Sequence, residues 1–264
     1  MTVGEALAEA EQRLAATGVD TPRVDAELLV GHVLGLTRTQ IYADSARELD
    51  AAVLEPLLRR REAREPLAYV LGEWGFRRLM LRTDERALVP RPETEVVVGR
   101  ALALIADLPT PSVLDVGTGS GAIALAIADE HPGANVTGVD SSLDALGLAR
   151  ENAARLGLDV ELRAGGPEVA EEGWDLVVSN PPYVDAAELP HLQPELQQEP
   201  AAALVDVGIH EELARRARKT WLLLEIGEDQ TDRISRTLAE LGYDQIRITP
   251  DLAGRDRVIE GRRG

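Results

Sequence analysis

The chain has 264 residues with 46 acidic and 28 basic side chains, so its formal net charge is −18. A chain this acidic is a poor candidate for binding a phosphate backbone, which requires clustered positive charge, and we expect no stable nucleic-acid partner. The absence of cysteine excludes disulfides and cysteine-ligated metals, and we expect no metal site. No apolar run approaches the roughly 18 residues of a membrane span, so we expect a cytoplasmic protein without a membrane partner.

Residues 1–72 predict a small helical domain. Apolar residues recur at helical spacing over Val3–Ala16, and a second helix is expected from Pro22 to a stop at Gly35. Capping residues then predict a short helix after Thr37 and another that follows Asp50. No catalytic constellation occurs here, so this domain is interpreted as one that recognises a partner or simply packs as an appendage.

Residues 73–92 predict a β-hairpin that links the helical domain to the next one. Over Trp74–Val89, short apolar runs alternate with turn residues. Arginines are concentrated near this segment and predict either a solvated face or a docking patch. They are Arg59, Arg60, Arg61, Arg64, Arg77, Arg78, Arg82, Arg86 and Arg91.

Residues 93–264 predict an α/β domain with a mostly parallel sheet and helices on both faces, because strands and helices alternate after a first helix at 93–106. The last two strands have no helix between them, so one of the two is expected to run antiparallel. The predicted helices are Ala122–Asp129, Ser142–Leu156, Gly208–Lys219 and Gln230–Leu241. The seven predicted strands are Val113–Val116, Asn135–Val139, Asp159–Leu162, Asp175–Ser179, Trp221–Ile226, Gln245–Thr249 and Arg257–Glu260.

A glycine-rich turn after the first strand predicts a cofactor site, because ligands of open α/β sheets bind at the carboxyl ends of the strands. A carboxylate at Asp115 could orient a cationic part of the cofactor. Asp140, at the end of the next strand, is placed to accept hydrogen bonds from ribose hydroxyls. The less specific interpretation is a tight strand-to-helix turn. The turn reads D-x-G-x-G-x-G and runs Asp115, Val116, Gly117, Thr118, Gly119, Ser120, Gly121.

The segment Asn180-Pro181-Pro182-Tyr183 follows the fourth predicted strand and predicts an acceptor site for a planar amide or amine. The lone pair of such a nitrogen is delocalised, so it needs hydrogen-bond acceptors that hold its N–H groups in place. The side-chain carbonyl of Asn180 and the backbone carbonyl of Pro181 can serve, and the two prolines restrict the backbone beforehand. The ring of Tyr183 offers a flat face for a planar group. A plain loop after a strand is the alternative.

These motifs, in this order, resemble the HemK/PrmC family of protein-(glutamine-N5) methyltransferases, which act on peptide chain release factors. The matching stretches are Pro66–Gly72, Pro90–Glu95, Asp115–Gly121, Asp140, Asn180–Tyr183 and Asp251–Arg255. The resemblance implies a class I methyltransferase fold, Rossmann-like with a mostly parallel seven-stranded sheet, and a helical domain that binds the release factor. It implies methyl transfer from S-adenosylmethionine to the glutamine of a Gly-Gly-Gln motif.

By the same resemblance, Gly117–Gly121 and Asp140 would hold the cofactor, Asn180 would contact cofactor and substrate, and Asn180–Tyr183 would hold the glutamine amide. The chain departs from the family at Arg163–Gly166, which lacks the usual acidic residue near the adenine, and at Ala203–Thr220, which is short. Two alternatives stay open. The Asn-Pro-Pro-Tyr motif also occurs in adenine-N6 DNA methyltransferases, and the missing acid would suit a non-catalytic protein that binds the cofactor and serves as an interaction module.

Overall fold

The computed structural model describes residues 1–264 and divides the chain into two units. The first unit contains Met1–Glu73 together with the distant segment Leu192–Gln198. The second contains Trp74–His191 and Glu199–Gly264. The hairpin therefore groups with the sheet domain, and one short stretch of the chain beyond Tyr183 groups with the helices.

The first unit is helical, as the sequence predicts. Thr2 and Glu5 form a capping box at the start of the first helix, Gly35 ends the second with φ 65°, and Thr37 and Gln40 form the second capping box. Its apolar stripes meet in one core. The helices are α1 (Val3–Ala16), α2 (Pro22–Leu34), α3 (Arg38–Ala43), α4 (Ala51–Glu62) and α5 (Leu67–Leu71), with the 3₁₀ turn η3 (Leu196–Gln198) from the distant segment.

The second unit opens with a two-stranded hairpin and continues as a seven-stranded sheet of order β5-β4-β3-β6-β7-β9-β8. Six of the seven strands run in the same direction, and β9 runs antiparallel to both of its neighbours, in agreement with the expectation that one of the last two strands is antiparallel. This is the class I methyltransferase arrangement that the resemblance implied. The strands are β1 (Glu73–Phe76), β2 (Leu79–Arg82), β3 (Ser112–Val116), β4 (Asn135–Asp140), β5 (Glu161–Ala164), β6 (Leu176–Ser179), β7 (Thr220–Glu225), β8 (Tyr243–Pro250) and β9 (Asp256–Arg263).

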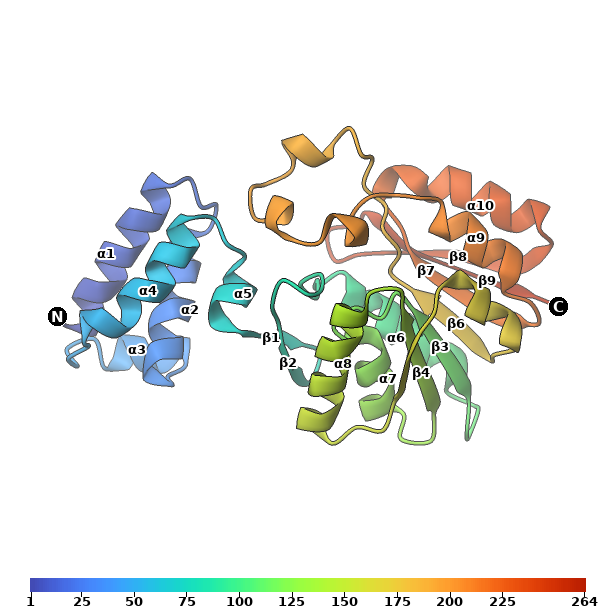
Figure 1. Cartoon of the computed structure of the whole chain (residues 1–264), viewed down its shortest axis with the longest axis horizontal. Coiled ribbons are helices and arrows are strands. Elements are labelled where there is room, and N and C mark those ends of the chain that lie inside the picture. The colour runs from blue at the N-terminus through green and yellow to red at the C-terminus, as the bar shows by residue number, and fades with distance from the viewer. The chain divides into compact units, whose positions relative to one another are not determined.

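Helices cover both faces of this sheet (Figure 1). The central strands alternate between two cores: Val113 and Leu223 pack with α6 and α7, whereas Leu114 and Leu224 pack with α9 and α10. Strands buried on both faces explain the nearly continuous apolar runs in the sequence. The helices are α6 (Thr94–Ile105), α7 (Ala122–Glu130), α8 (Leu143–Leu156), α9 (Ile209–Arg216) and α10 (Thr231–Glu240), and the 3₁₀ turns are η1 (Pro167–Glu172), η2 (Leu189–His191), η4 (Ala201–Ala203) and η5 (Glu228–Gln230).

Several element boundaries differ from the prediction by one to three residues, most clearly at the third strand, α9, β8 and β9. The third strand begins at Glu161, two residues later than expected, because its backbone pairs with β4 only over Glu161–Ala164. Helix α9 ends at Arg216 rather than Lys219, and Ala217 is already extended. Lys219 adopts φ 56°, so a lysine takes the left-handed position where a glycine would be expected before β7.

The arginine concentration is balanced within each unit by carboxylates. In the first unit, Arg61 is buried and contacts Asp25, and in the second Arg86 contacts Asp84 and Glu151. These pairs favour the solvated or structural interpretation of the arginines over a docking patch. The remaining pairs are Arg59–Glu55, Arg60–Glu65, Arg64–Glu195, Arg77–Glu130, Arg78–Asp129, Arg82–Glu151 and Arg91–Glu199. No helix of the structure combines the length and apolar character needed to cross a membrane.

Candidate active site

The glycine-rich turn lies at the carboxyl end of β3, between β4 and β6, where the strand order reverses. The backbone N–H groups of Gly117 and Thr118 both donate to the Val139 carbonyl, at 2.8 and 2.9 Å, which fixes the turn against β4. Gly117 and Gly119 have φ of 72° and 56°, and a Cβ at Gly117 would meet no atom within 4 Å. The turn thus leaves open space beside its backbone, as a cofactor cradle requires.

Asp115 is fully buried beneath this turn. One carboxylate oxygen accepts hydrogen bonds from the Thr118 hydroxyl at 2.6 Å and the Ala124 N–H at 3.2 Å, while the other oxygen has no partner. Burial raises the pKa of Asp115 to about 7, against an ordinary value of 3.8. An unpartnered carboxylate oxygen at this depth suits a cationic ligand, because a positive charge would stabilise its ionised form.

Asp140 ends β4 and is held in place by two backbone N–H groups. Gly119 donates to one of its carboxylate oxygens at 2.9 Å and Ser142 to the other at 2.8 Å. Each oxygen keeps a further lone pair, so the carboxylate can also accept hydrogen bonds from a ribose. Asp115, the turn and Asp140 therefore form one polar edge, and its unpartnered oxygen and open backbone fit a cationic nucleoside such as S-adenosylmethionine.

The missing acid after the third strand is partly offset by Glu168, which the sequence analysis did not single out. Gly165 donates to the Asp140 carbonyl at 3.2 Å, so this loop lies next to Asp140. Glu168 accepts from the Gly166 N–H at 2.7 Å, and backbone hydrogen bonds lower its pKa. A carboxylate is therefore present in the 3₁₀ turn η1, which follows β5.

The acceptor segment follows β6, the strand next to β3. Ser179 donates its hydroxyl to the Val116 carbonyl at 2.6 Å, which ties the end of β6 to the start of the glycine-rich turn. Asn180 comes next, and its side-chain N–H₂ donates to the Thr94 hydroxyl at 3.1 Å. The side-chain carbonyl of Asn180 makes no hydrogen bond to the protein and is free to accept one from an N–H group of a substrate.

Pro181 is buried, and Tyr183 is half-buried beside Gly227. The Tyr183 carbonyl accepts a 3.4 Å hydrogen bond from Gln230, and burial raises the pKa of the Tyr183 phenol to about 12. The ring is therefore neutral at physiological pH and can act as an apolar surface. The predicted residues Asn180–Tyr183 and Asp115–Gly121 thus lie on adjacent strand ends of one sheet edge.

Four further residues support this edge, and the sequence analysis did not identify their roles. Buried Asn152 donates to the Ser120 carbonyl at 2.9 Å and accepts from the Arg82 N–H at 2.7 Å, which fastens the hairpin to the turn. Buried Glu199 accepts from the Val89 N–H at 2.8 Å. Thr94 and Glu225 contact each other beneath Asn180. Of the four, only Thr94 lies in a motif that the sequence singles out, Pro90–Glu95.

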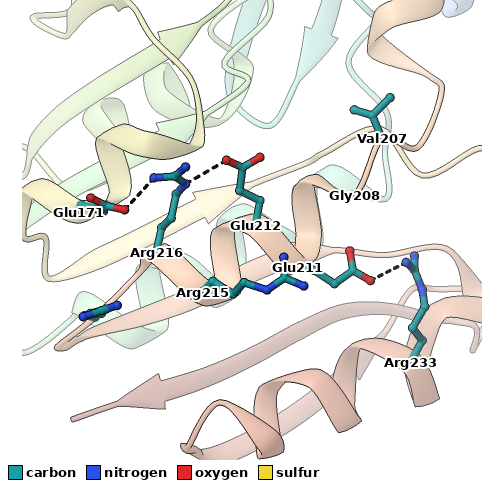
Figure 2. Close-up of a pocket in the computed structure, with 9 residues that line it drawn as sticks. Glu171, Val207, Gly208, Glu211, Glu212, Arg215, Arg216 and Arg233 are labelled. Carbon is teal, nitrogen blue, oxygen red and sulfur yellow. Dashed lines mark hydrogen bonds and ion pairs between the residues drawn. The ribbon is translucent and has the colours of Figure 1, made fainter.

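A separate hollow of about 840 Å³ lies beside α9 (Figure 2). It contains none of the residues of the glycine-rich turn or of Asn180–Tyr183. Two of its four arginines pair with its three glutamates, Arg216 with Glu171 and Glu212, and Arg233 with Glu211. The hollow therefore lies apart from the residues that the sequence predicts for the site.

Comparison with known proteins covers both units. Residues 5–72 match the model of the PrmC N-terminal domain, and residues 98–217 match that of the methyltransferase small domain. The release factor glutamine methyltransferase of Deinococcus radiodurans is 40% identical over 100% of this chain and 99% of its own length. That of Caulobacter vibrioides is 37% identical over 99% of this chain and 96% of its own.

A solved structure shows the same fold at low identity. The catalytic domain of hMettl16, crystallised with the hairpin 6 of the MAT2A 3′UTR, superimposes with a TM-score of 0.57 and 13% identity. The superposition covers 69% of this chain and 74% of that one. At this identity it supports the methyltransferase fold of the second unit and carries no argument about substrate.

Proposed function

Because the chain belongs to the family of release factor glutamine methyltransferases, we propose that it methylates the side-chain amide of the Gly-Gly-Gln glutamine in a peptide chain release factor. S-adenosylmethionine is the methyl donor. Family membership disfavours both alternatives, a DNA adenine methyltransferase and a non-catalytic binding module. Release factors act at the ribosome, so the proposal also places the chain in the cytoplasm.

The observation that carries the proposal is the hydrogen bond from the Asn180 side-chain N–H₂ to the Thr94 hydroxyl. This bond uses the donor end of the amide and leaves the acceptor end for substrate. The glutamine amide has two N–H groups, and the Asn180 and Pro181 carbonyls can accept one each. Acceptors held in place in this way orient the glutamine nitrogen and increase the electron density on it.

S-adenosylmethionine, when bound, supplies a methyl group made electrophilic by its sulfonium. Asp115 and the turn Gly117–Gly121 would hold the methionine part, and Asp140 would accept hydrogen bonds from the ribose. The glutamine nitrogen forms a bond to the methyl carbon as the carbon–sulfur bond breaks, and the nitrogen then loses one proton. No base has to remove that proton beforehand, so orientation and electrostatics account for the rate.

We assign recognition of the release factor to the helical unit, residues 1–72, and acceptor chemistry to residues 93–264, with residues 73–92 as the link between the two roles. The match of residues 5–72 to the PrmC N-terminal domain supports this division. The surface that contacts the factor is expected to be specific rather than broadly basic, because the arginines near the hairpin are paired with carboxylates.

The test is incubation of the protein with methyl-labelled S-adenosylmethionine and an unmethylated release factor, in the presence of duplex DNA. The proposal expects label on the factor alone. Label on the DNA would transfer the assignment to the adenine enzymes. Binding of the cofactor without label on either substrate would support the non-catalytic alternative.

A further inference from the structure

Behind Asn180, two buried residues form a short hydrogen-bonded chain. Thr94 is the first residue of α6, and its hydroxyl donates to Glu225 at 2.7 Å. The same hydroxyl accepts the Asn180 N–H₂ at 3.1 Å. Thr94 and Glu225 are 4% and 1% exposed, so water cannot replace either bond.

We propose that Glu225 and Thr94 are positioning residues that fix the rotamer of the Asn180 amide and so aim its carbonyl at the substrate. This inference rests on the proposed function, because it concerns how the acceptor site holds the glutamine.

The number of hydrogens that Thr94 and Glu225 can donate decides how the Asn180 amide is oriented. A threonine hydroxyl has one hydrogen, and an ionised carboxylate can only accept. With Glu225 ionised, that hydrogen goes to Glu225, so Thr94 can offer Asn180 only a lone pair. The amide must then present its N–H₂ to Thr94 and its carbonyl to the opposite side. Rotated by 180°, the amide would place its carbonyl against a hydroxyl with no hydrogen left to give.

Protonation of Glu225 removes this constraint. A neutral carboxyl can donate to the Thr94 hydroxyl, which then has its own hydrogen free to donate to Asn180. The flipped amide becomes acceptable, and it would present N–H₂ to the N–H₂ of the substrate. Addition of one proton at Glu225 would therefore allow the Asn180 N–H₂, instead of the Asn180 carbonyl, to face the N–H₂ of the substrate glutamine.

The surroundings of Glu225 bring this protonation into an accessible pH range. Its second oxygen is buried without a hydrogen-bond partner, and burial raises its pKa to about 7. The hydrogen bond from Thr94 and the charged Arg257 on β9 oppose this increase, and the charge of Glu93 just before α6 adds to it. Tyr183 also faces the Glu225 carboxyl group and stays neutral, whereas His210 bonds the backbone carbonyl of Glu225, and burial lowers the pKa of its imidazole.

The first test replaces the hydroxyl. Thr94→Val keeps the shape of the side chain and removes both hydrogen bonds, so kcat with release factor should fall by about 10-fold or more, as for a misoriented catalytic group. KM for the factor and affinity for S-adenosylmethionine should stay unchanged. Thr94→Ser keeps the hydroxyl and should restore most of the rate. Thr220→Val is the matched control. It removes another buried hydroxyl, at the end of β7 that lies opposite Glu225, and should leave kcat unaltered.

The second test uses pH, which a purely structural role would not affect in this way. In the wild-type protein kcat should rise as the pH increases through about 7, as Glu225 loses its proton. Glu225→Gln can donate to Thr94 at every pH, so its kcat should be low and independent of pH over this range. Glu260→Gln, at a buried carboxylate paired with Arg100, is the control and should keep the wild-type profile.

The outcomes separate this inference from the proposed function. If the wild-type protein does not methylate the factor, the proposed function fails. If it does, but Thr94→Val has the wild-type kcat, or Glu225→Gln keeps the wild-type pH profile, the positioning role is overturned. The side-chain ¹⁵N–H₂ resonances of Asn180 give a readout without turnover: they should shift in Thr94→Val and stay in place in Thr220→Val, and no shift in Thr94→Val would also overturn the proposal.

Discussion

Arg64 and Glu195 form a bidentate ion pair although 131 positions separate them in the chain, with Nε–Oε1 and Nη2–Oε2 distances of 2.6 and 2.7 Å. Glu195 belongs to the segment Leu192–Gln198, which follows the Asn180–Tyr183 motif in the chain but is part of the helical unit. Arg61, which is 5% exposed, contacts the same carboxylate at 2.7 Å. The helical unit is therefore completed by residues from beyond the acceptor motif.

Glu195→Gln should loosen the helical unit. Without the carboxylate, buried Arg61 keeps only Asp25 as a charged partner, and loss of one member of a largely buried ion network costs about 1–3 kcal/mol. All three tryptophans lie in the second unit, so tryptophan fluorescence would not report on the helical unit. Hydrogen–deuterium exchange of peptides from α1 and α4 is therefore the suitable measurement. Exchange there should accelerate. Glu188→Gln, at an exposed position before this segment, is the control, and equal exchange in both variants would contradict the account.

Asn180→Ala should lower kcat for methyl transfer by ~100-fold or more, because one positioned electrostatic partner typically contributes that much. The fold should persist, since the side chain makes a single hydrogen bond to the protein. Steady-state kinetics with release factor provides the measurement. Asn135→Ala removes an exposed asparagine at the start of β4 and should behave as wild type. Near-normal turnover by Asn180→Ala would remove this residue from the acceptor site.

Asn152→Leu should destabilise the second unit and weaken cofactor binding together. The buried Ser120 carbonyl would lose its partner, which costs about 1–3 kcal/mol for a group left unsatisfied, and the part-buried Arg82 N–H would lose its bond as well. Because Ser120 belongs to the glycine-rich turn, the affinity for S-adenosylmethionine should fall as well. Urea unfolding and calorimetric titration measure the two effects. A stability loss with unchanged affinity would show that the turn keeps its shape without Asn152.

Asp115 should make the stability of the cofactor-free protein depend on pH. Its folded pKa, about 7, exceeds its ordinary 3.8, so the native state binds the proton more tightly. Its contribution to the free energy of unfolding is therefore greatest below the lower pKa and is lost as the pH rises to the higher one. The loss totals about 4 kcal/mol between about pH 4 and pH 7.

Asp115→Asn is neutral throughout and should lack this loss. The difference in unfolding free energy between the wild-type protein and the variant should thus fall with pH, as measured by urea unfolding at about pH 5 and about pH 8. A difference that is constant or that increases with pH would contradict the assigned shift. Cofactor binding below pH 7 should also release a proton, because a cation beside Asp115 favours its ionised form.

Local signals explain which elements could be predicted. The helix Val3–Ala16 was predicted with the bounds observed, because Thr2 caps it and its apolar residues follow the helical period. The absence of a helix between the last two strands predicts that one of them is antiparallel, and the structure shows that it is β9. The third strand was misplaced by two residues because β5 is an edge strand, whose bounds depend on pairing with β4 rather than on its own pattern.

The supporting layer of the site could not be predicted. Thr94 and Glu225 meet across 131 positions, and Asn152 reaches Arg82 across 70. Nothing in the spacing of these residues distinguishes them from ordinary helix and strand residues. The motifs themselves carried a local signal, because a strand, a glycine-rich turn and a rigid Asn-Pro-Pro segment are contiguous in the chain. Their hydrogen-bond partners become apparent only when the sheet brings distant strand ends together.

Tandem mass spectrometry of the release factor after incubation with S-adenosylmethionine tests the central claim most directly. The account predicts one added methyl group on the glutamine of the Gly-Gly-Gln motif with the wild-type protein, and only a trace of it with Asn180→Ala after the same time. Methylation at another residue, or equal modification by both proteins, would contradict the account.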